Sequence, residues 1–443
     1  MKKFIMLIVL VFGIIAFAAC GAGAGTGGGG GEAAAPQQAP QGQPAVVDAG
    51  ATGRTVNAHI FHYKVDTIDE LQNLANMFAA QFEGADVTIT IETIGGGGDY
   101  EPALAARFAA GDVPDIFALS GANFVEMYKE HIVDLTDDPW IRYTVDGLLD
   151  QVTFNGRVFA QPLAIEAYGY IFNVDLFEQV GITQAPTTFS ELVDVAERLY
   201  AGGIRPFSSG YGVWWVLSQH FFNATVLSEM GLDAVSRVGI DESFANHPRL
   251  LSEMMDLLHL TTRFGGNEAA LALDYNTSVS DFAAGRTAII QQGTWIQPLI
   301  NELNPDMRIG IFGFLTNDGP NTGLLPVGNA GYWVVYNNSD YVDVMRDFLT
   351  FMATDEAAIN SIVNDFMFIP AFTGADYDLS TLGSIFAALQ PFIEEGRTSD
   401  WVWPALPPGF GPALFSTFQE AAIGRIDLET FTAEIDSIIA DMR

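Results

Sequence analysis

The sequence predicts an α/β protein, because strand-like and helix-like segments alternate from residue 55 onward. An apolar strand at Thr55–Phe61 precedes a helical pattern at Ile68–Phe82, and Val87–Ile94 then alternates apolar with polar residues, as a strand does. A second helix is expected at Tyr100–Ala110 and a third strand at Asp115–Leu119. This β-α-β-α-β order favours a largely parallel sheet with helices on its faces.

Beyond residue 150 the same two kinds of segment continue. The region Phe154–Phe177 is rich in strand patterns, and the chain is mostly helical from Tyr341 to its end. Helices are expected between these regions at Phe189–Tyr200, Trp214–Met230 and Arg249–Arg263, and strands at Ala288–Gln291, Arg308–Leu315 and Gly331–Tyr336. No repeat of fixed period occurs, which argues against a solenoid or a propeller.

The composition excludes several classes of protein. Hydrophobic residues make up 49% of the 443, so the chain is not mainly disordered. Lys and Arg number 19 against 54 Asp and Glu, and the resulting charge of −35 repels phosphate backbones, so no nucleic-acid partner is expected. A single cysteine excludes intrachain disulfides, and the six histidines are scattered without ligand spacing. We therefore expect no metal and no cofactor.

The amino terminus predicts export. Lys2 and Lys3 precede an apolar run, Phe4–Ala19, which is shorter than the roughly 20 residues of a bilayer span. The residues just before Cys20 resemble a bacterial lipobox, although Phe17 stands where that pattern usually has Leu. The resemblance implies a lipid on Cys20; an ordinary secretory signal is the alternative. The Gly, Ala, Pro and Gln residues that follow predict a flexible tether.

Four stretches in the body of the chain occur in a distinctive order. They are Gly111–Phe117 (GDVPDIF), Asn155–Tyr168 (NGRVFAQPLAIEAY), Tyr170–Leu192 with its PTTF segment, and Phe282–Trp295, which reads FAAGRTA and then GTW. Their order resembles that of the extracellular solute-binding proteins of ABC importers, in the branch that includes maltodextrin-binding protein. The resemblance implies a type II periplasmic-binding-protein fold of two α/β lobes. Each lobe would have a mainly parallel sheet with flanking helices, and hinge strands would join the lobes.

The resemblance also implies a division of the chain into segments. We expect a signal peptide at 1–19, a lipid-anchored flexible linker at 20–53, a first N-lobe segment at 54–164, a first C-lobe segment at 165–285, a return through the N-lobe and hinge at 286–335, and C-lobe helices with a cleft-edge loop at 336–443. A ligand would lie in the cleft between the lobes.

Two residues are the leading candidates for contact with a sugar. A sugar has apolar C–H faces and a rim of hydroxyls, so its site needs flat aromatic rings and strong acceptors. Glu166 follows Pro162 in the expected crossover strand, where maltodextrin-binding relatives place a sugar-contacting glutamate. Trp295 matches a sugar-stacking tryptophan of the same relatives. A hinge salt bridge for Glu166 and core packing for Trp295 are the alternatives.

Further candidates surround these two. Tyr63, followed by Lys64 and Asp66, comes at the carboxyl end of the first strand, an edge that borders the ligand crevice in open α/β sheets. One of Trp214 and Trp215 is expected to face the cleft, with Trp214 as our choice, and one of Tyr332 and Trp333. Trp401 and Trp403 lie in a Pro-rich loop that either covers the cleft or packs against the body.

One stretch departs from the family pattern. After the third strand, Leu119–Asn123 lacks the aromatic, aspartate and arginine that hold maltodextrin in relatives, and only Ser120 and Asn123 can form hydrogen bonds. Ser120 is included among the expected ligand contacts, but maltodextrin specificity is not implied.

These observations predict a monomeric, lipid-anchored, extracytoplasmic receptor of a bacterial ABC transporter, without enzymatic activity. It would capture a carbohydrate, expected to be an oligosaccharide, and deliver it to the transmembrane permease subunits. Two alternatives stay open. The same fold could bind a peptide, a polyamine or another cation attracted by the negative charge, or the protein could be a glycoside-acting enzyme that uses Glu166 with a second carboxylate.

Overall fold

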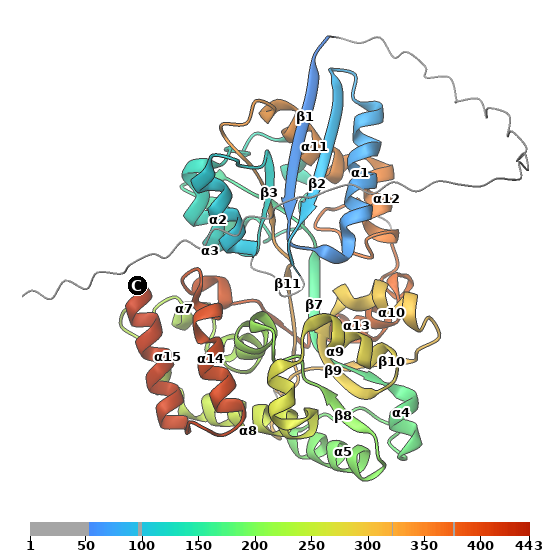
Figure 1. Ribbon diagram of the computed structural model, residues 1–443, viewed down its shortest axis with the longest axis vertical. Coiled ribbons are helices and arrows are strands. Elements are labelled where there is room, and N and C mark those ends of the chain that lie inside the picture. Colours follow the sequence, from blue (N-terminus) through green and yellow to red (C-terminus); the bar gives the residue numbers. More distant parts are fainter. Residues whose placement is uncertain (1–52, 96–99, 321, 375–376) are drawn as a thin grey trace, which may run out of the picture. The chain divides into compact units, whose positions relative to one another are not determined.

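The computed structural model describes residues 53–95, 100–320, 322–374 and 377–443. All of them belong to one unit, Ala51–Arg443, drawn as a ribbon in Figure 1. The expected signal peptide, Cys20 and nearly all of the expected linker lie outside the described residues. The described part contains two larger β-sheets and the two-stranded hairpin of β4 (Thr153–Phe154) and β5 (Arg157–Val158).

The first sheet has five strands in the order β2-β1-β3-β12-β6. They are β1 (Thr55–His62), β2 (Asp86–Thr93), β3 (Ile116–Leu119), β6 (Gln161–Pro162) and β12 (Tyr332–Val335). Strand β1 pairs in parallel with β2 and β3, whereas β12 is antiparallel to β3 and β6. The order β1, α1, β2, α2, β3 confirms the alternation expected for the first lobe.

Helices cover both faces of this sheet. They are α1 (Ile68–Gln81), α2 (Tyr100–Ala110), α3 (Ala122–Tyr128), α11 (Val342–Thr354) and α12 (Glu356–Asn364). One core joins α1, α11 and α12, and a second core joins α2 and α3 on the opposite face. Because successive strand residues point to opposite faces, Ile60 belongs to the first core and Phe61 to the second.

The second sheet has six strands, with the order β13-β11-β7-β9-β8 and β10 paired to β7. They are β7 (Ile165–Asn173), β8 (Arg205–Ser208), β9 (Thr287–Gly293), β10 (Ile309–Phe312), β11 (Leu325–Asn329) and β13 (Thr398–Asp400). The two-lobed α/β fold is confirmed, but the expectation of a mainly parallel sheet in each lobe is wrong here. Strand β7 is antiparallel to β9, β10 and β11, because the chain returns to it from the opposite direction.

Helices also surround the second sheet and share one large core with it. They are α4 (Val174–Gln179), α5 (Phe189–Ala201), the π-helical η5 (Trp215–Phe221) and η6 (Asn223–Leu227), α6 (Ser228–Met230), α7 (Leu232–Val235), α8 (Pro248–Gly265), α9 (Tyr275–Ala283), α10 (Gln297–Leu303), α13 (Ser384–Glu394), α14 (Phe410–Ala422) and α15 (Leu428–Met442). Helix α5 begins after Thr188, whose side chain accepts a hydrogen bond from the backbone N–H of Glu191.

Short 3-10 helices complete the described elements. They are η1 (Val65–Thr67), η2 (Lys129–His131), η3 (Pro139–Tyr143), η4 (Asp150–Val152), η7 (Phe244–Asn246), η8 (Asn267–Ala272), η9 (Thr294–Ile296), η10 (Leu379–Leu382) and η11 (Trp403–Ala405).

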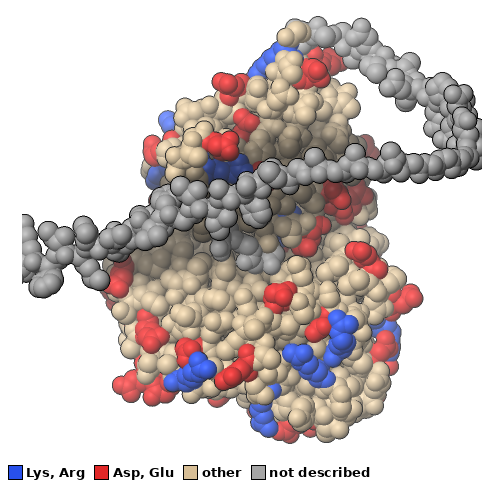
Figure 2. All heavy atoms as spheres, in the orientation of Figure 1, with Lys and Arg blue, Asp and Glu red and all other residues tan. Residues whose placement is uncertain are grey.

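None of the described helices combines the length and the apolar character that a membrane span requires. Figure 2 shows acidic side chains scattered over the visible face of both lobes, separated by wide uncharged areas.

Two expected segment boundaries differ from the observed sheets. The segment 286–335 was expected to return through the N-lobe, yet β9, β10 and β11 belong to the second sheet. The segment 336–443 was expected to lie wholly in the C-lobe, yet α11 and α12 pack on the first sheet through Val344, Met345 and Phe348. A helical pattern records that one face is buried, but not which sheet buries it.

Three stretches of chain connect the two sheets. The first joins β6 to β7, the second joins β11 to β12, and the third follows α12. The first two run side by side, with the Ala330 N–H donating to the Ala164 carbonyl at 2.7 Å and the Leu163 N–H donating to the Gly331 carbonyl at 2.8 Å. The third joins them through the Ile165 N–H, which donates to the Ile369 carbonyl at 2.9 Å. These stretches form the hinge.

Gly331 in the hinge allows a close approach that no other residue could make. Its φ is +150°, and a Cβ placed there would lie 1.8 Å from the hydroxyl oxygen of Tyr63. That hydroxyl donates to the Ala330 carbonyl at 2.6 Å. We therefore expect Gly331→Ala to lower the free energy of unfolding by about 1–3 kcal/mol more than a glycine substitution without a clash.

Urea denaturation of the variant measures this loss. Gly156→Ala is the matched control, because Gly156 also has positive φ, +77°, but a Cβ there would meet nothing within 4 Å. Equal losses in the two variants would contradict the packing argument and leave only backbone strain.

Candidate ligand-binding cleft

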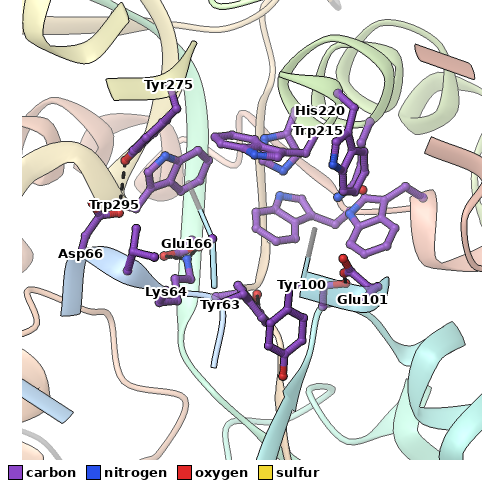
Figure 3. A pocket seen from close by; sticks show the side chains of 18 residues that line it. Tyr63, Lys64, Asp66, Tyr100, Glu101, Glu166, Trp215, His220, Tyr275 and Trp295 are labelled. Atoms are coloured by element: carbon purple, nitrogen blue, oxygen red, sulfur yellow. Dashed lines mark hydrogen bonds and ion pairs between the residues drawn. The ribbon is translucent and has the colours of Figure 1, made fainter. Parts of the chain in front are cut away.

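A cavity lies between the two lobes, with an empty volume of about 870 Å³ that includes its open mouth (Figure 3). Loops at the ends of β1, β2 and β3 form one wall, and the start of β7 with η5, η9 and the loop at 401–403 forms much of the other. The first lobe contributes Tyr63, Lys64, Asp66, Tyr100, Glu101 and Ser120, and the second contributes Glu166, Trp214, Trp215, Gln219, His220, Tyr275, Trp295, Trp401 and Trp403.

An ion pair between Lys64 and Glu166 stands in the wall of this cavity. The Lys64 Nζ lies 2.5 Å from Oε1 and 2.6 Å from Oε2 of Glu166, and only 13% and 3% of the two side chains are exposed. The Lys64 Nζ also lies 5.5 Å from the centre of a Trp295 ring, within cation–π range. Each charge is thus neutralised at a place where water has largely been excluded.

Tryptophan rings form most of the apolar surface of the cavity. Five of the protein's seven tryptophans line it, which supplies the flat surfaces on which a ring-shaped ligand can stack. The rings of Trp215 and Trp295 are 6.0 Å apart and nearly perpendicular, at 74°. The Trp295 Nε1 donates to the Gln292 Oε1 at 2.8 Å, which fixes the orientation of that ring.

Two of these tryptophans have unused hydrogen-bond donors. Trp401 and Trp403 are both 8% exposed, and their indole N–H groups have no hydrogen-bond partner among the described residues. A buried donor without a partner is costly, and these two N–H groups are enclosed by protein while other parts of the same residues line the cavity. The sequence predicts that this loop either covers the cleft or packs against the body, and its two tryptophans both line the cavity and belong to the core of the second lobe.

Carboxylates stand on either side of the aromatic surface in Figure 3. Asp66 in η1 accepts a hydrogen bond from the hydroxyl of Tyr275 in α9 at 3.2 Å, which joins the two lobes. Glu101 in α2 accepts from the hydroxyl of Ser120 at 2.9 Å. A second junction is made by Asn123, whose side-chain N–H donates to the Leu406 carbonyl at 3.0 Å.

His220 is a buried imidazole inside the aromatic cluster. Its ring stacks on Tyr168 with the centres 4.4 Å apart and the planes at 18°. Burial, aided by the nearby Lys64 charge, lowers the pKa of His220 to about 3, so the ring is neutral near pH 7. It lies in the π-helical segment η5, a rare local geometry that often occurs at functional sites.

Five of the seven predicted ligand contacts line this cavity: Tyr63, Ser120, Glu166, Trp214 and Trp295. Tyr332 and Trp333 do not. Strand β12 lies inside a sheet with helices on both faces, so Tyr332 packs in one core and Trp333 in the other, against His62 at 4.6 Å. Tyr332, the first residue of its strand, also lines another hollow between the lobes together with Ser120, Trp401 and Trp403. The expectation of a residue facing the cleft therefore fails for Trp333 and stays a prediction for Tyr332.

Sequence reasoning missed several residues of the cavity. They are Tyr100, Glu101, Gln219, His220 and Tyr275. Trp215, left open as a partner of Trp214, lines the cavity too. Gln219 and His220 follow Trp214 and Trp215 by about one helical turn. This spacing was the one sequence signal that could have placed them in the cavity wall. Among the described residues, no group of three His, Cys, Asp or Glu is arranged to hold a metal ion.

A ligand-sized cleft between two hinged α/β lobes is the defining feature of solute-binding proteins. The family model for bacterial extracellular solute-binding proteins matches residues 66–359, and the chain belongs to this family. Members of the family serve ABC importers outside the cytoplasm, and they bind solutes rather than transform them.

Curated relatives share low sequence identity with the chain. The multiple sugar-binding protein of Streptococcus mutans is 24% identical over 49% of this chain and 53% of that protein. The maltotriose-binding protein of Pyrococcus abyssi is 22% identical over 62% of this chain and 58% of that protein. The matched stretches thus span between half and two thirds of these two relatives.

Solved structures agree with the fold over nearly their whole length. A solute-binding protein, RafE, in complex with raffinose superposes with a TM-score of 0.72 at 18% identity, covering 87% of this chain and 99% of that one. A chitin oligosaccharide binding protein gives a TM-score of 0.72 at 19% identity, covering 88% and 99%. These similarities establish the fold.

The ion pair yields a first prediction for the site. Lys64→Met leaves the buried Glu166 carboxylate without its partner, so we expect the free energy of unfolding to fall by about 3–5 kcal/mol. The double variant Lys64→Met/Glu166→Gln removes both charges and should recover most of that loss. Urea denaturation measures both, and a double variant no more stable than the single one would contradict the pairing argument.

The buried histidines yield a second prediction. Burial lowers the pKa of His62 and of His220 in the folded protein, so only the unfolded chain takes up these protons below about pH 6.5. The free energy of unfolding should therefore fall as the pH drops from 7 to 5, by up to about 1.4 kcal/mol per pH unit for each group.

Urea denaturation at pH 7, 6 and 5 measures that slope. His220→Gln should reduce it by about the share of one group, and the same substitution at the exposed His131 is the matched control. A slope that His220→Gln leaves at its original value would rule out a neutral buried imidazole at this position.

Proposed function

We propose that this protein is the substrate-binding component of an ABC importer and that it captures a carbohydrate, an oligosaccharide, in the cavity between its lobes. The captured sugar is delivered to the transmembrane permease subunits. The protein acts as a monomer outside the cytoplasm and is held at the membrane by a lipid on Cys20, a residue outside the described part of the chain.

The tryptophan-lined cavity carries this proposal. The faces of Trp214, Trp215 and Trp295 suit the apolar C–H faces of sugar rings. The names of similar proteins support the same class of ligand, since they include binders of maltotriose, raffinose and chitin oligosaccharides.

The ion pair argues for binding rather than catalysis. Both carboxylate oxygens of Glu166 accept hydrogen bonds from the Lys64 Nζ, so neither oxygen is left to act as a general acid. The carboxylate can still accept hydrogen bonds from sugar hydroxyls through its remaining lone pairs. The glycosidase alternative, which needed Glu166 as a catalytic group, has less support than a binding role.

A cationic solute is the second candidate, and Asp66 and Glu101 favour it. With Lys64 offset by Glu166, these two carboxylates leave the cavity walls with a negative balance. A cation held by them would bind more weakly as salt is added, whereas a neutral sugar would be almost indifferent to salt.

Isothermal titration with neutral mono- to tetrasaccharides, including raffinose, stachyose, maltotriose and chitin oligosaccharides, tests the proposal. We expect at least one to bind with little dependence on salt, and Trp295→Ala to weaken it about tenfold or more through loss of the stacking surface. Tyr200→Ala, an aromatic substitution at a side chain that is 69% exposed and outside the cavity, is the control. Failure of the folded protein to bind any of these sugars would overturn the proposal.

A further inference from the structure

A second hollow opens beside the sugar cavity, with an empty volume of about 1190 Å³. Helices α2 and α3 of the first lobe form one side of this groove, and η5 with the segment 403–412 of the second lobe forms the other. The groove therefore exists only where the two lobes meet. Nothing in the function proposed above requires it.

The groove and the cavity share a wall. Glu101, Trp214, Gln219 and Trp403 line both of them. The two hollows therefore lie next to each other along these four side chains.

Polar groups are concentrated at that shared wall. It carries the Glu101 carboxylate and the Gln219 amide. Beyond the shared wall, the lining side chains are apolar apart from Asn123 and Ser218. The groove therefore changes from polar to apolar with distance from the cavity.

The two polar side chains beyond the shared wall are already used within the protein. The Asn123 amide donates to the Leu406 carbonyl at 3.0 Å, and its oxygen accepts from the Phe124 N–H at 3.0 Å. The Ser218 hydroxyl lies 2.8 Å from the Trp214 carbonyl oxygen and 2.6 Å from that of Gly411. A sugar hydroxyl placed here would give up water without gaining a side-chain partner of comparable quality.

The remaining lining offers apolar surface that is still in contact with water. Met127 on α3 is 51% exposed. Its side chain is polarizable and packs readily on flat groups. Pro102 and Ala105 of α2 line the groove as well, and Pro407 and Pro408 come from the second lobe. Covering such a surface with an apolar group is favourable because it removes both surfaces from water.

From this arrangement we infer that the groove binds an apolar group attached to the captured sugar, so that the ligand is an amphiphilic glycoside with an aryl or alkyl substituent. The inference rests on the proposed function and adds a substrate class to it. The sugar lies in the cavity against the tryptophans, and the substituent passes Trp214 and Trp403 into the groove. Further sugar units in the groove are the competing occupant, and they are disfavoured by its lack of available hydroxyl partners.

Isothermal titration of the whole chain with matched glycosides distinguishes these occupants. The probes are the methyl and phenyl glycosides of glucose, galactose and N-acetylglucosamine, together with disaccharides that carry a second sugar in place of the phenyl group. For the sugar that binds, we expect the phenyl glycoside to bind at least tenfold tighter than the methyl glycoside, with a more negative heat-capacity change. The second sugar should add less affinity than the phenyl group does.

A charge placed in the groove tests its location. Met127→Glu should bring the ratio of phenyl to methyl affinity close to one, because the carboxylate keeps that end of the groove hydrated. Leu303→Glu is the matched control, since Leu303 is 49% exposed on α10 and outside the groove, and it should keep the full ratio.

Four results would overturn the inference. Equal binding of the methyl and phenyl glycosides, or a larger gain in affinity from a second sugar, would contradict the binding of an apolar substituent. Neither result would contradict the capture of a sugar. A phenyl preference that survives Met127→Glu would place the substituent elsewhere. Failure of every sugar and glycoside to bind would overturn the proposed function and this inference together.

Discussion

The ion pair between Lys64 and Glu166 is the constraint on which the cleft depends. Lys64 follows the first strand of one lobe, and Glu166 is the second residue of the strand that opens the other. A pair this deeply buried is tolerated only when both partners are present, because either charge alone would lack compensation. The pair therefore fixes the position of one lobe relative to the other near the hinge. Aromatic rings make up most of the remaining cavity surface.

The hinge is coupled to the cavity through one side chain. Tyr63 lines the cavity with its ring, while its hydroxyl donates to the Ala330 carbonyl in the crossing segment that joins β11 to β12. The absence of a side chain at Gly331 makes room for this contact. Asp66 with Tyr275 and Asn123 with Leu406 add contacts between the lobes at the edges of the cleft. A change in lobe angle would thus alter several polar contacts at once, which is how a binding protein can link capture to closure.

Much of the fold followed from local patterns. The order of strands and helices from Thr55 to Leu119 is as predicted, and α1 buries the face formed by Leu71, Leu74, Ala75 and Phe78 that its spacing indicated. The family motifs singled out Glu166 and Trp295, and both line the cavity. The prediction failed at Trp333, because alternation along a strand separates two faces but does not show that helices cover them.

The sequence by itself thus determined the class of fold, the apolar faces of its helices and strands, and the supply of aromatic and acidic side chains. Only the tertiary structure decided that α11 and α12 join the first sheet, that β9 joins the second, and that Lys64 meets Glu166 across 102 positions. The physical reason is that sequence periodicity indicates whether a side chain is buried, but not which distant part of the chain buries it. That depends on the path of the chain, which crosses the hinge three times. Side chains such as Tyr100 and His220 became cavity residues through that path alone.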